Sequence, residues 1–111
     1  MSLAFDFHPE ARLELLADGE WYDERELGLG ERFETSVRAA IDGARDSPVS
    51  CAVWPGWVGE PVVRSKRVGV FPHRVVFFVR GDLLTVVAVA HAKRRPGYWR
   101  DRVRPPGGPR E

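Results

Sequence analysis

The chain has 111 residues, of which 43% are hydrophobic and 30% charged, a composition typical of one globular domain and not of a disordered segment. The single cysteine, Cys51, excludes an internal disulfide and a zinc site built from several cysteines. No secretion signal is evident and no apolar run is long enough to cross a bilayer, so we expect a cytoplasmic protein that does not engage a membrane.

The formal net charge of +1 hides two oppositely charged halves. Residues 1–48 hold 5 Arg against 12 Asp and Glu, a net charge of −7. Residues 62–104 hold 11 Lys and Arg against 2 Asp, a net charge of +9. Such asymmetry is typical of proteins that contact a polyanion, although a solvated basic face has the same composition. Contact with nucleic acid or with an acidic protein segment is therefore a hypothesis to test.

The first half of the chain predicts a strand and two helices. Residues 3–8 alternate between apolar and polar, a pattern typical of a short strand. Pro9 fits the first turn of a helix, and Gly19 within that helix favours a kink or a break. A second helix is predicted to begin at Leu29 and to end before Ser47, because apolar residues recur every three or four positions. Together the two helices form a hairpin whose apolar faces need a cover.

The second half predicts a loop and three strands. Prolines and glycines punctuate residues 49–61, which we interpret as a loop whose Trp54 and Trp57 plug the edge of the core. The strands are predicted at residues 62–68, 73–80 and 83–91, with a tight turn at Gly81-Asp82 and both faces of the last two strands buried. Residues 1–102 thus predict a single α+β domain, in which an N-terminal strand and a helical hairpin pack on a small, mostly antiparallel, twisted sheet. Residues 96–102 can form a final helical turn, and residues 103–111 predict a flexible tail.

Candidate functional residues gather after the last predicted strand. His91 can serve as an acid or a base in catalysis, and Tyr98 can stack a base or orient a phosphate. Both tasks belong to metal-free RNA cleavage, which must also stabilise the phosphate charge. Alternation places Arg64 and Lys66 on one face of their strand, about 7 Å apart, where they can cradle one phosphate. We expect these cations, the other late arginines and His91 to share one concave surface that faces a negatively charged guest. The candidate contacts to phosphate or to a partner are Arg64, Lys66, Arg67, Arg74, Arg94 and Arg95.

The same residues have purely structural interpretations. A histidine at a strand end packs or caps more often than it catalyses, and Tyr98 and Trp99 can simply close the core. Glu60 is the only glutamate near the basic half, and nothing places it opposite His91, so the acid and base set for RNA cleavage is incomplete. We predict neither a metal nor a cofactor, because phosphate-binding motifs are missing and the histidines are scattered along the chain at positions 8, 73 and 91.

Four segments, in this order, resemble the RelE/ParE toxin superfamily of type II toxin–antitoxin systems. They are Trp21-Tyr22, residues 29–33, residues 70–77 and residues 89–100, so the resemblance spans roughly residues 3–102. The most specific is Phe71-Pro72-His73-Arg74, which precedes a Gly-Asp hairpin and a strand that ends in histidine. It is similar to the ParE-like branch, also described as plasmid-stabilisation proteins.

The resemblance implies the toxin half of a pair that a cognate antitoxin neutralises. RelE-type members act on the ribosome and cleave messenger RNA, whereas ParE-type members poison DNA gyrase and need no nuclease chemistry. The incomplete acid and base set favours the ParE-like function, so we expect an inhibitor of growth that targets gyrase. The alternatives are a ribosome-dependent mRNA endonuclease that uses His91, Tyr98 and the arginines, and a non-toxic protein-interaction module. Whether the chain is an enzyme stays open.

Overall fold

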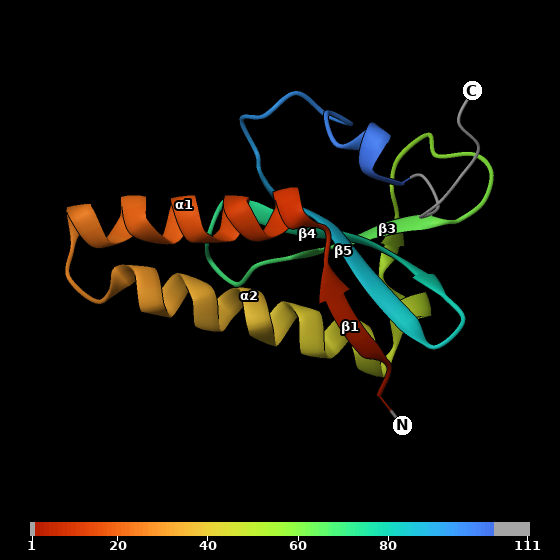
Figure 1. The fold of residues 1–111 in the computed structure, drawn as a ribbon, viewed down its shortest axis with the longest axis horizontal. Helices are drawn as coiled ribbons and strands as arrows, with labels where there is room; N and C mark the ends of the chain where they lie inside the picture. Colours follow the sequence, from red (N-terminus) through yellow and green to blue (C-terminus); the bar gives the residue numbers. More distant parts are fainter. Residues whose placement is uncertain (1, 104–111) are drawn as a thin grey trace.

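The computed structural model describes residues 2–103, which form an α+β fold (Figure 1). In chain order the elements are β1 (Ala4–Phe7), α1 (Pro9–Arg25), α2 (Leu29–Asp46), β2 (Ala52–Val53), β3 (Val63–Arg67), β4 (His73–Arg80) and β5 (Leu83–His91). Short 3-10 turns lie at Pro48–Ser50 and Arg100–Val103. The predicted fold class is confirmed. No helix within residues 2–103 is long and apolar enough to span a membrane.

The sheet has five strands in the order β1-β5-β4-β3-β2. Only β1 and β5 pair in parallel, and the helical hairpin belongs to the connection between these two strands. The other pairs are antiparallel, and they place Arg67 opposite Arg74 and His73 opposite His91. The two-residue strand β2 lies in the segment predicted as a loop, because it is too short to show alternation.

The hairpin packs closely at two glycines. α1 runs without interruption through Gly19, so the expected kink or break there is wrong. The reason is packing against α2: a Cβ atom on Gly30 would lie 2.3 Å from the carbonyl oxygen of Gly19. The two helix backbones approach each other where neither residue has a side chain, and this contact compensates the weak helix propensity of glycine.

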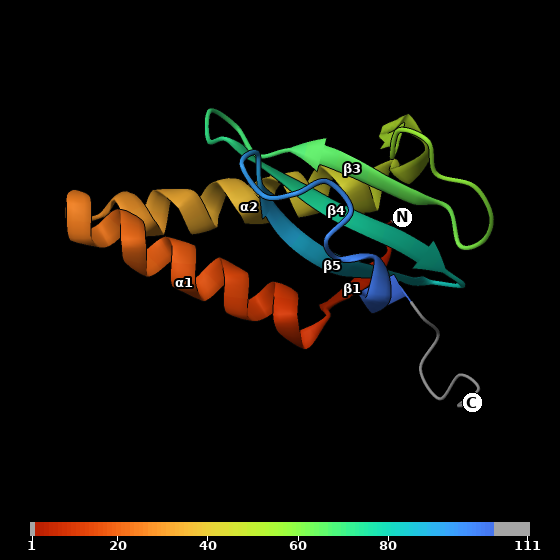
Figure 2. The ribbon, with the colours of Figure 1, turned by 90° about the horizontal axis from the view of Figure 1, so that it is seen from above.

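Each face of the sheet carries its own core, as predicted for β4 and β5. On the hairpin face, which α1 and α2 cover, Phe33 and Ile41 pack with Val75 and Phe77. The opposite, outer face is covered by residues 92–103, which we call the C-terminal arm (Figures 1 and 2). After β5 the chain reverses direction, and the arm runs back across the outer face of the sheet.

The arm buries two of its side chains on the outer face. Trp99 is only 1% exposed, and Trp54 and Trp57 pack against it with ring centroids 5.0 Å and 5.8 Å away, which confirms their predicted place at the edge of the core. Val103 is buried as well, so the boundary predicted between residues 102 and 103 lies too early. The rest of the predicted tail, residues 104–111, lies outside the described residues.

Candidate functional site

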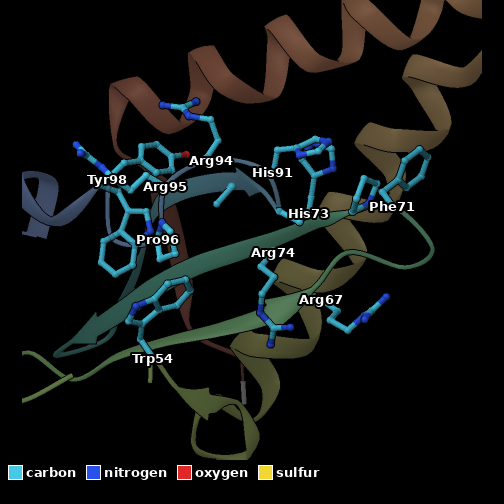
Figure 3. Close-up of a pocket in the computed structure, with 14 residues that line it drawn as sticks. Trp54, Arg67, Phe71, His73, Arg74, His91, Arg94, Arg95, Pro96 and Tyr98 are labelled. Carbon is cyan, nitrogen blue, oxygen red and sulfur yellow. The ribbon is translucent and has the colours of Figure 1, made fainter. Parts of the chain in front are cut away.

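The start of the arm and the outer face of the sheet enclose a cavity of about 300 Å³, which we call the arginine cavity (Figure 3). Arg67 of β3 and Arg74 of β4 lie at its sheet side, and Arg94 and Arg95 come from the arm. The apolar part of its lining includes Trp54 and Pro96. Cations from β3, from β4 and from the arm therefore line this cavity, and Arg94 also lines a second cavity beside α1.

Two of these cations are direct cross-strand neighbours. Arg67 and Arg74 face each other across the β3–β4 pair, an arrangement that is destabilising for like charges. Arg74 is fixed by a hydrogen bond of 2.8 Å that its Nε donates to Ser65 Oγ. Among the described residues, no carboxylate forms an ion pair with any of the four arginines of the cavity. The cavity is consequently a strongly positive surface that an anion can neutralise.

Tyr98, at the edge of the arginine cavity, has both its ring and its hydroxyl engaged. The guanidinium carbon of Arg94 lies 3.8 Å from the centre of the ring, the geometry of a cation–π contact. The hydroxyl donates a hydrogen bond of 2.8 Å to Glu14 Oε2. Burial, and then the bond to this carboxylate, raise the pKa of Tyr98 well above its usual value. Tyr98 therefore keeps its proton and connects the arm to α1 through Glu14.

Glu14 of α1 receives three donors at once. Besides the Tyr98 hydroxyl, its carboxylate accepts the backbone N–H of Val89 at 3.0 Å and faces Nη1 of Arg102 at 2.9 Å. The pairing of β1 with β5 ends at Phe7 and Val86, so the Val89 N–H lies beyond the reach of β1. Glu14 thus accepts a hydrogen bond from a part of β5 that β1 does not reach, and it also binds the arm through Tyr98 and Arg102.

His73 and His91 lie on the hairpin face. As cross-strand partners they share a face, and their ring centroids are 4.9 Å apart. His73 is only 3% exposed, and its Nε2 lies 2.9 Å from Asp18 Oδ2 of α1. Because a carboxylate can only accept, this nitrogen carries the proton. Burial lowers the pKa of His73, an effect that His91 reinforces and Asp18 opposes.

The two imidazoles border a second cavity, of about 420 Å³, between α1 and the end of β5. Asp18, Trp21 and Tyr22 line its helix side, and Lys93 lines it from the arm. Nδ1 of His91 accepts the backbone N–H of Lys93 at 2.9 Å, so the exchangeable proton of this ring lies on Nε2. His91 also touches the arginine cavity, but its ring turns toward the helices.

Figure 3 shows that the candidate residues do not converge on one point. The imidazoles of His73 and His91 turn toward α1, whereas Arg67 and Arg74 turn the other way. The expectation that His91 and the arginines face one guest is therefore wrong for the Arg67–Arg74 pair. Alternation along β4 is the cause, since neighbouring residues point to opposite faces of the sheet.

Two predicted cations lie outside the arginine cavity. Arg64 and Lys66 share a face of β3, as expected, but α2 covers part of that face. Arg64 donates a hydrogen bond of 2.9 Å to the carbonyl of Cys51. Lys66 lies across α2 at Gly43, where an added Cβ atom would be 2.9 Å from its Cε. Arg64 and Lys66 thus lie on the hairpin face, so the expectation that they share one surface with Arg67 and Arg74 is wrong.

Sequence reasoning missed the carboxylates of Glu14 and Asp18. These residues lie four positions apart on α1, between Ala11 and Tyr22, which belong to the stripe that packs on the sheet. Helical periodicity places both acids on one face of α1, but it does not show that this face meets the basic segment. The two late histidines also lie closer together than their spacing suggested. Within the described residues, no three His, Cys, Asp or Glu side chains are grouped so as to hold a metal ion.

Two solved structures share this architecture. The chromosomal ParDE TA system from P. aeruginosa matches 81% of this chain and 96% of its own, with a TM-score of 0.67 and 15% identity. A mutant of the E. coli toxin RelE in the free state matches 84% of this chain and 86% of its own, with a TM-score of 0.58 and 18% identity. The chain has the RelE/ParE fold. No family model and no curated protein matches it, and at these identities the RelE/ParE fold alone does not establish an activity.

Proposed function

We propose that this chain is the toxin of a type II toxin–antitoxin pair, and that it inhibits growth without cleaving RNA, as a ParE-like poison of DNA gyrase. The shared RelE/ParE fold supports the toxin role. One observation supports the absence of nuclease chemistry: the His91 imidazole and the Arg67–Arg74 pair turn to opposite faces of the sheet.

RNA cleavage without a metal needs a base, an acid and a cationic clamp around one phosphate group. These groups must lie within hydrogen-bond reach of the reacting atoms, because a small misplacement costs much of the rate. The imidazole of His91 turns toward α1 and away from the Arg67–Arg74 pair, although His91 borders the same cavity. Tyr98, the other candidate, uses its proton to bind Glu14, and its raised pKa keeps it neutral. This arrangement supports a protein that acts by binding.

The proposal includes a cognate antitoxin that binds the chain and blocks its action. The test is inducible expression in a bacterial host, alone and together with the reading frame adjacent to its gene. We expect growth to stop on induction and to resume when that reading frame is co-expressed. Unimpaired growth at a verified level of soluble, folded protein would contradict the toxin role and favour an interaction module of the same fold.

A further inference from the structure

The second cavity, between α1 and the end of β5, carries opposite charges on its two sides. Asp18 lines it from the helix, and Lys93 lines it from the arm. No ion pair joins the two, and Lys93 pairs with no other carboxylate among residues 2–103. Glu14, the other acid of the lining, is already paired with Arg102. The cavity therefore holds one anion and one cation that do not neutralise each other.

On the helix side, nothing in the described chain balances the charge of Asp18. Its Oδ2 accepts the Nε2 proton of His73 at 2.9 Å. Burial lowers the pKa of His73, so at neutral pH this ring brings no positive charge to the pair. Nδ1 of the same ring is buried and has no hydrogen-bond partner within residues 2–103. A carboxylate without a counter-charge, next to an unsatisfied acceptor, favours a bound cation on this side.

On the arm side, two donors remain for a ligand. Nδ1 of His91 accepts the backbone N–H of Lys93, so Nε2 carries the proton, and this nitrogen donates to no other described residue. The side chain of Lys93 is exposed. Arg94 is already engaged, because its guanidinium lies over the ring of Tyr98. An imidazole N–H and an ammonium together suit the two oxygens of a carboxylate.

The helix side also provides an aromatic surface. Trp21 and Tyr22 both line the cavity, and their rings meet edge to face with centroids 5.3 Å apart. Trp21 is 51% exposed, and the guanidinium of Arg25 lies over its ring at 3.7 Å. A half-exposed indole beside a few polar groups is typical of a surface that packs against an apolar ligand group.

We propose that the second cavity binds a free amino acid with an aromatic or other apolar side chain. The ammonium group of the ligand pairs with Asp18, and its carboxylate binds Lys93 and Nε2 of His91. The apolar side chain of the ligand packs on Trp21. The volume of about 420 Å³ lies within the usual range for small-ligand pockets. This inference goes beyond the proposed function, and inhibition of growth and ligand binding are measured separately, so either can fail without the other.

The experiment is isothermal titration of the full chain with L-phenylalanine and two analogues. Phenethylamine lacks the carboxylate, and 3-phenylpropionate lacks the ammonium group. We expect saturable one-to-one binding of L-phenylalanine, and binding at least about tenfold weaker for each analogue, because each has lost one charged contact.

Two substitutions assign the charges. Asp18→Asn keeps an oxygen that accepts the His73 proton, so the fold is retained while the charge is lost. It should weaken L-phenylalanine by about tenfold and leave 3-phenylpropionate unchanged. Lys93→Gln alters an exposed side chain and should do the reverse, weakening L-phenylalanine about tenfold and leaving phenethylamine unchanged.

Two further variants complete the series. Trp21→Ala should weaken all three compounds, because the aromatic surface for their common ring is lost. Asp82→Asn is the matched control for Asp18→Asn. It lies in the turn between β4 and β5, at the opposite end of these strands from His73 and His91, and should bind L-phenylalanine as the unmodified chain does.

Three results would overturn the proposal. The first is no binding of L-phenylalanine at millimolar concentration. The second is equal binding of L-phenylalanine and both analogues, or an equal loss in Asp18→Asn and Asp82→Asn, since either would show that the charges of the cavity are not used. The third is binding of a short peptide that contains phenylalanine under conditions where the free amino acid does not bind, which would assign the cavity to a protein segment.

Discussion

Tyr98 donates its hydroxyl hydrogen bond to Glu14 although 84 positions separate the two residues in the chain. The same carboxylate accepts the Val89 N–H and pairs with Arg102, so one side chain of α1 binds both β5 and the C-terminal arm. The arm in turn covers the outer core with Trp99 and supplies part of the arginine cavity. The shape of that cavity therefore depends on a contact with the other, acidic half of the chain.

Tyr98→Phe should lower the free energy of unfolding by about 1.5–3 kcal/mol, the usual contribution of a hydrogen bond to a charged group. Urea denaturation followed by circular dichroism measures this change. Tyr22→Phe is the control, because the Tyr22 hydroxyl makes no hydrogen bond to another described residue, and it should change stability by less than about 0.5 kcal/mol. Equal losses in the two variants would contradict the role of Glu14.

The stability of the fold should decrease as the pH falls below 6.5, the ordinary pKa of histidine. Because burial lowers the pKa of His73 in the folded chain, the unfolded chain takes up a proton first, and unfolding is favoured in acid. The contribution is fully present above the unfolded pKa and is lost as the pH falls from there toward the folded pKa.

Urea unfolding at several pH values between about 7.5 and 5 tests this prediction. His73→Gln should reduce the slope of the unfolding free energy against pH by the equivalent of up to one proton, because it removes the buried titrating group. An unchanged pH dependence in that variant would assign the effect to other groups.

Gly30→Ala should destabilise the chain by about 1–3 kcal/mol, the usual cost of overpacking. Its new Cβ atom would lie 2.3 Å from the backbone oxygen of Gly19, so the helices must separate. Gly43→Ala is the control on the same helix, since there the nearest atom, at 2.9 Å, belongs to the flexible end of Lys66. That variant should be neutral or up to about 1 kcal/mol more stable, as alanine favours helix. Thermal unfolding that ranked the two variants the other way would contradict the packing of the hairpin.

Trp99→Ala should destabilise the fold by about 3–5 kcal/mol, because it empties the centre of the outer core. Near-ultraviolet circular dichroism should show the loss of the rigid environment of Trp54 and Trp57. Trp21 offers a matched control, since it is 51% exposed on α1. If Trp21→Ala cost as much as Trp99→Ala, the assignment of the outer core to the arm would be wrong.

Periodicity predicted most of the elements, because their burial leaves a pattern in the sequence. Phe33 and Ile41 lie on one face of α2 at helical spacing, and the alternation in β4 reflects its two cores. Helical periodicity and strand alternation do not show which helix or segment covers a given face of the sheet. Alternation therefore grouped Arg64 with Lys66 correctly but could not show that Lys66 lies across α2.

The candidate site was harder to predict because it joins distant segments. Glu14 and Asp18 reach the basic half only because β1 pairs with β5 and draws α1 along that edge of the sheet. The antiparallel register of β4 and β5 likewise brings His73 and His91 together. Neither the β1–β5 pairing nor the β4–β5 register can be recognised from the local sequence. The arm was expected as little more than a helical turn, and its role as the cover of the outer face follows from tertiary contacts of Trp99 and Val103.

The most direct test of the proposed function maps both DNA breaks and the 5′ ends of messenger RNA in cells after induction of the chain. We expect breaks of the kind that a poisoned gyrase leaves, unchanged messenger ends, and the same inhibition of growth by a folded His91→Ala variant. New 5′ ends in messenger RNA that disappear in His91→Ala would contradict the account, because they would show that the imidazole cleaves RNA despite facing away from Arg67 and Arg74.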